Sequence, residues 1–254
     1  MRIISAAPSN TEILYALGLG ESVVAVTRFC DYPEDAKTKP NIGGWIDVNY
    51  EKLKSFNPDL VIASSFVQNK IVTELKKQGI KVLQVDPLSI NDVYESIRRI
   101  GEVTGTAIQA EKLIQDMQNG FLAIQTERGM LQQRFKVYAE EWHQPPTCAG
   151  NWVPELIELA GGNSFCPQGI VSEPFDENKL FAWNPKIVIL HWCGFGTQSN
   201  IDWFKQRWPT LDAVKNNKVY CIDDRLLNRP GPRLVEATRE IQKVLGVMQV
   251  NSPA

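Results

Sequence analysis

The sequence contains one series of short patterns twice, in the same order. Residues 57–63 read Asn-Pro-Asp-Leu-Val-Ile-Ala, and residues 184–189 read Asn-Pro-Lys-Ile-Val-Ile. Residues 81–86, Lys-Val-Leu-Gln-Val-Asp, recur as residues 218–223, Lys-Val-Tyr-Cys-Ile-Asp. A short apolar run bounded by turn residues is typical of a buried strand. The duplication therefore predicts an α/β fold with two lobes of equivalent topology.

Helix and strand signals place further elements around these runs. The predicted strands also include residues 2–6, 23–26 and 136–140, and the strand in the run 81–86 is residues 82–85. The predicted helices are about residues 9–17, 69–78 and 152–161. Ser9 with Glu12 three residues later is a capping-box pattern at the start of the first helix. The predicted domains are an N-terminal α/β lobe at 1–88, a helical linker at 89–134 and a C-terminal α/β lobe at 135–254.

No proline interrupts the linker between about Ser89 and Arg134. Its second part, from about Thr106, has apolar spacing compatible with one long helix, although Gly120 and Gly129 weaken that pattern. About 29 helical residues would extend over roughly 40 Å, at about 1.5 Å per residue. Because the linker is rich in Glu, Gln, Leu and Ile and not in Gly and Ser, we predict a rod that limits hinge motion between the lobes.

The composition limits the class of protein. The formal net charge is -2 and no long basic run is present, which argues against a nucleic-acid-binding surface. No stretch approaches the roughly 20 apolar residues of a membrane helix, so no membrane insertion is predicted. The first residues lack a secretory-signal pattern, and five cysteines are scattered without CxxC spacing. Because such cysteines suit a reducing compartment, we predict a cytoplasmic protein; the alternative is a periplasmic or extracellular protein whose signal peptide has been removed.

Aromatic residues recur at one topological position in both lobes. In open α/β sheets ligands bind beyond the carboxyl ends of the strands, and Trp45, Trp142 and Trp192 fall in loops predicted there. Amphipathic rings that line a cleft between the lobes suit a large ligand with apolar faces and a polar rim. The predicted strand-end loops carry Pro8, Ser9, Asn10, Phe29, Asp31, Tyr32, Trp45, Ser64, Ser65, Phe66, Glu141, Trp142, His143, His191 and Trp192.

Reactive side chains also fall in these loops, and each has a simpler interpretation. His143 and His191 are the only histidines, too few for a zinc or manganese site, so hydrogen-bonded lining is the favoured interpretation. Glu140 and Glu141 are adjacent in a predicted strand and point to opposite faces. No GxGxxG or P-loop motif is present. We therefore predict a binding protein without a catalytic residue, a metal site or a catalytic cofactor; the alternative is an enzyme that acts on a bound metabolite through His143, His191, Glu141 or Cys193.

Five segments distributed along the chain match one known family. They are residues 3–5 with 8–12, 30–33, 57–63, 155–162 and 228–233, the last reading Asn-Arg-Pro-Gly-Pro-Arg. On these segments the chain resembles, over residues 2–247, the cobalamin-binding branch of the periplasmic-binding-protein-like (class III, helical-backbone) substrate-binding proteins of ABC transporters. The resemblance implies two Rossmann-like lobes bridged by one long helix. It also implies that cobalamin or a related corrinoid is the ligand and binds in the cleft between the lobes.

The resemblance also implies site residues and partners. Trp152 and Arg229 join the predicted ligand-binding residues, and the positions where such receptors contact cobalamin match residues 141–146 with Phe29, Tyr32, Trp45, Ser64 and Phe66. Transport-coupled members carry a Glu on each lobe that docks a membrane permease, whereas this chain has residues 68–70 (Gln-Asn-Lys) and Asn228 there. The predicted function is therefore an intracellular corrinoid-binding protein without permease docking. The alternative is a secreted ABC-transporter component for cobalamin, a siderophore or haem.

Overall fold

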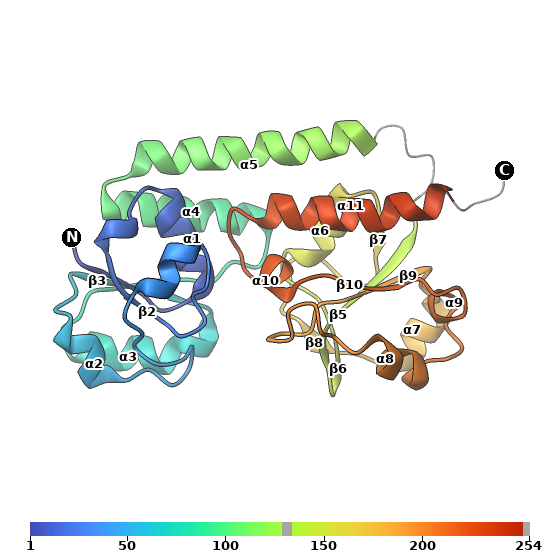
Figure 1. Cartoon of the computed structure of the whole chain (residues 1–254), viewed down its shortest axis with the longest axis horizontal. Helices are drawn as coiled ribbons and strands as arrows, with labels where there is room; N and C mark the ends of the chain where they lie inside the picture. The colour runs from blue at the N-terminus through green and yellow to red at the C-terminus, as the bar shows by residue number, and fades with distance from the viewer. Residues whose placement is uncertain (129–133, 251–254) are drawn as a thin grey trace. The chain divides into compact units, whose positions relative to one another are not determined.

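The computed structural model describes residues 1–128 and 134–250, without the side chains of residues 128 and 247–250. The chain forms two compact units. Unit 1 comprises Met1–Pro87 and Asn91–Asp116, and unit 2 comprises Leu88–Ile90 and the chain from Met117 onward. Each unit has its own sheet (Figure 1) and its own hydrophobic core. The predicted α/β fold class is confirmed.

Unit 1 is built on a parallel sheet with the strand order β2-β1-β3-β4. Its strands are β1 (Ile3–Ser5), β2 (Val23–Val26), β3 (Leu60–Ser64) and β4 (Val82–Val85). Every residue of β3 is buried, which explains why this strand reads as a continuous apolar run. The connections contain α1 (Pro8–Ala16), α2 (Tyr50–Ser55), α3 (Asn69–Lys77) and short 3-10 turns at Gly20–Ser22, Glu34–Thr38 and Phe66–Gln68.

Unit 2 repeats this arrangement. Its central strand β5 (Lys136–His143) pairs in parallel with β7 (Asn163–Ser164) and β9 (Ile187–Leu190), and β9 pairs in parallel with β10 (Val219–Cys221). The order β7-β5-β9-β10 corresponds to β2-β1-β3-β4, which confirms the predicted equivalent topology. The helices that follow β5 are α6 (Val153–Leu159), α7 (Glu177–Trp183), α8 (Ile201–Arg207), α9 (Asp212–Lys215), α10 (Asp224–Leu227) and α11 (Leu234–Val250).

The repeated Asn-Pro pattern has a backbone cause. Asn57 and Asn184 both adopt the left-handed conformation, with φ of 46° and 52°. Each lies in the turn between a helix and the equivalent strand, β3 in unit 1 and β9 in unit 2. Asparagine tolerates this conformation better than most residues with a side chain. The same turn chemistry therefore marks the same topological position in both units.

Unit 2 also carries an antiparallel extension. Strand β6 (Pro146–Cys148) pairs with the end of β5 on one side and with β8 (Glu173–Pro174) on the other. Cys148 in β6 forms a disulfide with Cys166, which lies 18 residues later. The interpretation of the five cysteines as an unpaired set is therefore wrong for this pair, because tertiary folding brings together two residues that no local motif connects. Cys30, Cys193 and Cys221 are not part of a disulfide.

The linker region forms two helices, α4 (Ile90–Thr104) and α5 (Ala107–Arg128), which are separated at Gly105 with a φ of 75°. The predicted start of the long helix agrees with α5. Its predicted end is wrong, since Arg134 is not helical; Gly129 and the residues up to 133 lie outside the described part. Helix α5 contributes residues to both units, and limited hinge motion stays a prediction. None of the helices in the described ranges has the length and apolar character needed to cross a membrane.

The start of α1 differs from the prediction. Helix α1 begins at Pro8, and its N-cap residue Ala7 makes no side-chain cap bond, so the capping box of Ser9 and Glu12 is wrong. A proline at the first helical position already has a helical φ and lacks an N–H that would need a partner. Ser9 and Asn10 are buried within the first turn, and Asn10 Nδ2 donates to the carbonyl of Ile62 in β3 at 3.3 Å. Asn10 therefore attaches α1 to the sheet.

Candidate ligand-binding site

Exposed aromatic side chains of unit 1 follow the carboxyl ends of β2 and β3. Phe29 and Tyr32 lie in the loop after β2, and Phe66 lies in the turn after β3. Phe29 and Phe66 are 48% and 51% exposed. The Arg28 guanidinium lies 5.0 Å from the centre of the Phe29 ring and forms an ion pair with Asp47 at 3.0 Å. Because all three exposed rings follow the carboxyl ends of β2 and β3, where ligands bind in α/β sheets, Phe29, Tyr32 and Phe66 are the ligand-contact candidates of unit 1.

Gln68 connects three segments at this edge of the sheet, and sequence analysis missed it. Its buried amide donates to the carbonyls of Ala6 at 2.8 Å and Trp45 at 2.6 Å. Its Oε1 accepts from the Ser64 N–H at 2.7 Å. A single glutamine at the start of a helix has no distinctive pattern, so only its tertiary contacts identify it. Trp45 is therefore positioned through its backbone, while its side chain is half-buried.

Unit 2 carries a set of ring side chains at the carboxyl ends of β5 and β9 and on α8. This aromatic cluster consists of Trp142, His143, Trp192, Phe195 and Trp203. The ring centres of Trp142 and Phe195 are 6.1 Å apart, and those of His143 and Trp192 are 4.7 Å apart. Trp142 and Phe195 are 38% and 37% exposed, whereas Trp192 belongs to the hydrophobic core. The interpretation of Trp192 as a residue outside the core is therefore wrong, because its loop folds the ring back onto the sheet.

A buried ion pair supports the aromatic cluster. Glu140 in β5 is fully buried, pairs with Arg207 and accepts from the Tyr138 hydroxyl at 2.8 Å and the Trp192 indole N–H at 3.0 Å. Arg207 also donates to the His143 carbonyl at 2.7 Å. Burial raises the pKa of Glu140 to about 7, although Arg207 and the hydrogen-bond donors act in the opposite direction. The pair holds the end of β5, from which Trp142 and His143 project.

His191 and Trp152 are predicted ligand contacts whose side chains are buried. His191 Nδ1 lies 2.6 Å from Asn228 Oδ1, and Asn228 Nδ2 donates to the His191 carbonyl at 3.2 Å. Burial lowers the pKa of His191 to about 4, against the effect of the Asn228 hydrogen bond, so the imidazole is neutral at neutral pH. The Trp152 indole N–H donates to the Leu227 carbonyl at 2.7 Å. Both residues have packing roles, and direct ligand contact by them stays a prediction.

Glu141 and Cys193 have surroundings that disfavour their charged forms. Burial raises the pKa of Glu141, although Ser172 Oγ donates to this carboxylate at 2.5 Å. Glu140 and Glu141 have separate partners, as expected for neighbours in a strand. Burial, Glu141 and Asp224 raise the pKa of the Cys193 thiol, which is therefore protonated at neutral pH and a poor nucleophile. In the part of the chain that the structure describes, no group of three His, Cys, Asp or Glu side chains is arranged to hold a metal ion.

The remaining predicted contacts lie on α1, at the end of β3 and in the loop after β2 in unit 1, and after α10 in unit 2. Ser64 is buried at the end of β3. Ser65, with a φ of 62°, accepts from the Val67 N–H at the start of the turn that exposes Phe66. Asp31, Arg229 and Pro8 are half-buried, and Ser9 and Asn10 are buried. The structure thus places predicted residues at one edge of each sheet, while ligand contact by them stays a prediction.

Known proteins similar to this chain are substrate-binding proteins. The chain is 31% identical over 249 residues to an uncharacterized ABC transporter substrate-binding lipoprotein, YvrC, of Bacillus subtilis, and the match covers 94% of this chain and 78% of that protein. It is 25% identical over 244 residues to a vitamin B12-binding protein of Yersinia pseudotuberculosis, with coverage of 94% and 84%. The crystal structure of a possible iron-binding (periplasmic solute-binding) protein from Staphylococcus epidermidis matches with a TM-score of 0.83 at 29% identity, with coverage of 96% and 98%.

These relatives overturn the predicted cytoplasmic location. The Bacillus relative is a lipoprotein, and the Staphylococcus protein is described as periplasmic. The Cys148–Cys166 disulfide agrees with an oxidising compartment. The cytoplasmic prediction is therefore wrong. It rested in part on dispersed cysteines, two of which the fold brings together.

The family membership follows from one further match. The sequence profile of the periplasmic binding protein family matches residues 3–226, which include every strand of both sheets. This match confirms, at the level of the family, the resemblance carried by the five sequence segments. The chain belongs to the periplasmic binding protein family.

Proposed function

We propose that this chain is the exported substrate-binding component of an ABC transporter and that it captures a bulky metal chelate. Cobalamin or another corrinoid is the favoured ligand, and an ABC permease is the partner that receives it. The observation that carries the ligand class is the set of exposed rings beyond the strand ends, Phe29 and Phe66 in unit 1 and Trp142 and Phe195 in unit 2. Such rings offer apolar contact area to a large, flat ligand.

The charges near these rings favour a corrinoid over a strongly anionic siderophore. Arg28 is paired with Asp47, and Arg207 is paired with buried Glu140. Both guanidinium groups already have carboxylate partners, whereas a catecholate siderophore carries several negative charges that need cationic partners. A corrin ring has apolar faces and a rim of neutral amides, which rings and polar backbone groups can satisfy.

An iron chelate is the second candidate. The observation in its favour is the Staphylococcus epidermidis structure, which is described as a possible iron-binding protein and is 29% identical to this chain. Haem offers flat apolar faces to the same exposed rings, but its two propionates need cationic partners that a neutral corrinoid rim does not. Competition between the two ligands therefore separates the candidates.

Titration of the purified protein with cyanocobalamin, haem and a ferric catecholate siderophore tests the proposal, with tryptophan fluorescence and visible absorption as readouts. One-to-one quenching by cyanocobalamin with a Kd at or below about 1 µM, roughly 8 kcal/mol, is the expected result. The ligand should be recovered unchanged, whereas the enzyme alternative predicts a chemically altered ligand. Saturable binding of haem or the siderophore alone would move the assignment to the second candidate. No response to all three would reject the ligand class.

Ring substitutions connect the binding to the proposed surfaces. Phe66→Ala in unit 1 and Trp142→Ala in unit 2 should each weaken cyanocobalamin binding about 5-fold or more, since truncation of a ring that anchors an interface costs over about 1 kcal/mol. The matched control is Phe181→Ala, which removes a comparably exposed ring on α7, away from the strand ends. An equal loss of affinity in Phe181→Ala would show that the effect does not come from the proposed surfaces.

A further inference from the structure

Phe195 lies in a loop that turns sharply on both sides of its exposed ring. Gly194 and Gly196, its two neighbours, have φ of 84° and 58°, a conformation that residues with a Cβ rarely adopt. The Phe195 N–H donates to the Trp192 carbonyl at 3.0 Å, and the Phe195 carbonyl accepts from the Gln198 N–H at 2.9 Å. The direction of the Phe195 ring therefore depends on whatever holds the two glycines.

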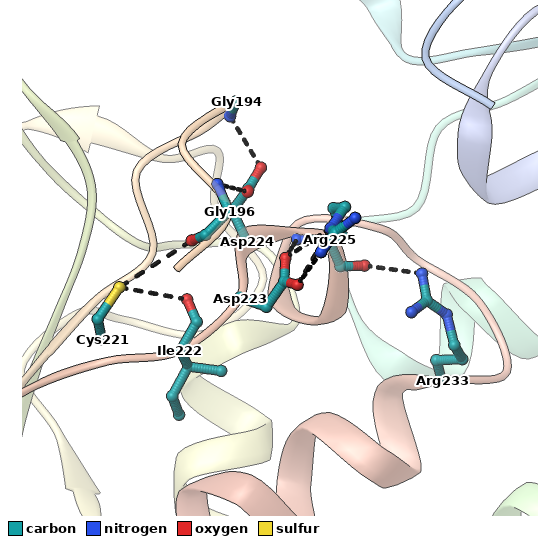
Figure 2. Close-up of polar contacts among 8 residues, drawn as sticks. All are labelled: Gly194, Gly196, Cys221, Ile222, Asp223, Asp224, Arg225 and Arg233. Carbon is teal, nitrogen blue, oxygen red and sulfur yellow. Dashed lines mark hydrogen bonds and ion pairs between the residues drawn. The ribbon is translucent and has the colours of Figure 1, made fainter. Parts of the chain in front are cut away.

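The carboxylate of Asp224, at the start of α10, holds both glycines. One oxygen accepts from the Gly194 N–H at 2.8 Å and the other from the Gly196 N–H at 2.6 Å (Figure 2). Asp224 is 7% exposed. Its neighbour Asp223 points to Arg225 instead and accepts from the Arg225 backbone N–H at 2.9 Å (Figure 2). Two adjacent acids therefore have separate partners, and only Asp224 contacts the loop.

We propose that Asp224 is a positioning residue that sets the orientation of Phe195 for ligand binding, an inference that rests on the proposed function. In the arrangement that Asp224 holds, the Phe195 ring centre lies 6.1 Å from that of Trp142 and 5.6 Å from that of His143. A carboxylate accepts through both oxygens, whereas an amide accepts through one and presents an NH₂ to the second N–H. Asp224 thus acts on the ligand through Phe195, and an isosteric amide is sufficient to disturb it.

The titratable and charged groups that act on or respond to Asp224 are Asp223, Arg229, Glu141 and Cys193. Burial raises the pKa of Asp224, and the charge of Asp223 raises it further. The N–H groups of Gly194 and Gly196 and the charge of Arg229 lower it, but their effect is smaller. Protonation places a hydrogen on one of the two acceptor oxygens. In the wild-type protein, the amide resonances of Gly194 and Gly196 should therefore both move as Asp224 titrates.

Amide hydrogen exchange in Asp224→Asn, with Asp223→Asn as the matched control, tests the contact without any ligand. In Asp224→Asn, exchange of the Gly194 or Gly196 N–H should accelerate about 10-fold or more, and circular dichroism should show a retained fold. Asp223→Asn should leave both rates within about 2-fold of the wild type. Unchanged protection of both glycines in Asp224→Asn would overturn the proposal. If that variant does not fold, the pH titration of the wild-type protein is the test. Amide resonances of Gly194 and Gly196 that do not shift with pH would then overturn the proposal.

The second arm tests the route to the ligand, with cyanocobalamin as the probe. Asp224→Asn should weaken its binding about 5- to 10-fold in the wild-type background and less than about 2-fold in the Phe195→Ala background, since coupled residues are not additive. An equal loss in both backgrounds would show that Asp224 acts by another route and would overturn the proposal. If the wild-type protein binds none of the three ligands, the proposed function fails separately, and the exchange arm still decides whether Asp224 holds the loop.

Discussion

The two units share a strand order but hold their exposed rings by different means. In unit 1 the loops at the strand ends are joined by the neutral amide of Gln68. In unit 2 the corresponding edge is supported by the buried pair of Glu140 and Arg207, and the added strand β6 is tied by the Cys148–Cys166 disulfide. Topology therefore determines where the ring-bearing loops emerge, while independent local contacts determine how they are held. The units should differ in their response to mutation, reductant and pH.

The largest effect is expected from loss of Arg207. Arg207→Met leaves the Glu140 carboxylate buried without its cationic partner, which should lower the free energy of unfolding by about 3–5 kcal/mol. Urea unfolding at about pH 8, where Glu140 of the wild-type protein is charged, measures the loss. The double variant Arg207→Met/Glu140→Gln removes both charges and should recover about half of it or more. A loss below about 1 kcal/mol in the single variant would contradict a buried, charged pair.

Loss of the disulfide should have the next largest effect. Cys148→Ser with Cys166→Ser opens a link between residues 18 positions apart, and we expect a loss of about 2–4 kcal/mol. A reductant should lower the melting temperature of the wild type and leave that of the double variant unchanged. Cys221→Ser, at a free half-buried thiol, is the control and should retain the response to reductant. If the reductant left the melting temperature of the wild type unchanged, the disulfide would not stabilise the fold.

Gln68 is the counterpart of the ion pair in unit 1. Gln68→Leu leaves the carbonyls of Ala6 and Trp45 and the N–H of Ser64 without their partner, so we expect a loss of about 2–3 kcal/mol in urea unfolding. The control Gln78→Leu removes an exposed side-chain amide that donates to Glu74 at 2.6 Å, and it should cost less than about 0.5 kcal/mol. Equal small losses in both variants would show that solvent replaces the Gln68 bonds.

The sheets were more predictable from the sequence than the contacts at their edges. Strands such as β3 and β9 are buried along their whole length, so each appears as an uninterrupted apolar run. Arg207 lies 67 residues from Glu140, and no local pattern connects the two. Trp192 shows the converse limit, because its position in a predicted loop indicated exposure while its ring folds back into the core. Contacts across long sequence separations therefore escaped prediction.

Unit 2 contains two buried groups that titrate in opposite senses. The pKa of Glu140 is raised from 4.5 to about 7, so its contribution to stability is present below about pH 4.5 and is lost as the pH rises through 7. The pKa of His191 is lowered from 6.5 to about 4, so its contribution is present above about pH 6.5 and is lost as the pH falls through 4. Each group changes the free energy of unfolding by at most about 1.4 kcal/mol per pH unit. Between about pH 4.5 and 6.5 both groups titrate, and their effects on stability have opposite signs.

Substitution of either residue alone should reveal how the other changes the free energy of unfolding with pH. Relative to the wild type, Glu140→Gln should lose stability on acidification from about pH 6.5 to 4.5, by about 1 kcal/mol per pH unit. His191→Gln should gain stability over the same window by a similar amount. Urea unfolding at three pH values measures both changes. Because the other carboxylates contribute the same pH dependence to all three proteins, their contribution cancels in the comparison with the wild type. Parallel pH profiles in all three proteins would contradict the opposed titrations.

The smallest effect on stability is expected at the ion pair of unit 1. Arg28 and Asp47 are 50% and 57% exposed, so solvent screens their attraction, and Arg28→Met should cost less than about 1 kcal/mol in urea unfolding. Because the Arg28 guanidinium also lies 5.0 Å from the centre of the Phe29 ring, the same substitution should weaken cyanocobalamin binding about 2- to 5-fold. Asp47→Asn is the control, since it removes the ion pair and keeps the cation beside the ring. If Arg28→Met lowered the free energy of unfolding as much as Arg207→Met, the contrast between the two units would be wrong. An exposed ion pair would then stabilise the fold as much as a buried one, and the solvent exposure of an ion pair would not indicate whether its arginine contributes mainly to stability or to the ligand-binding surface.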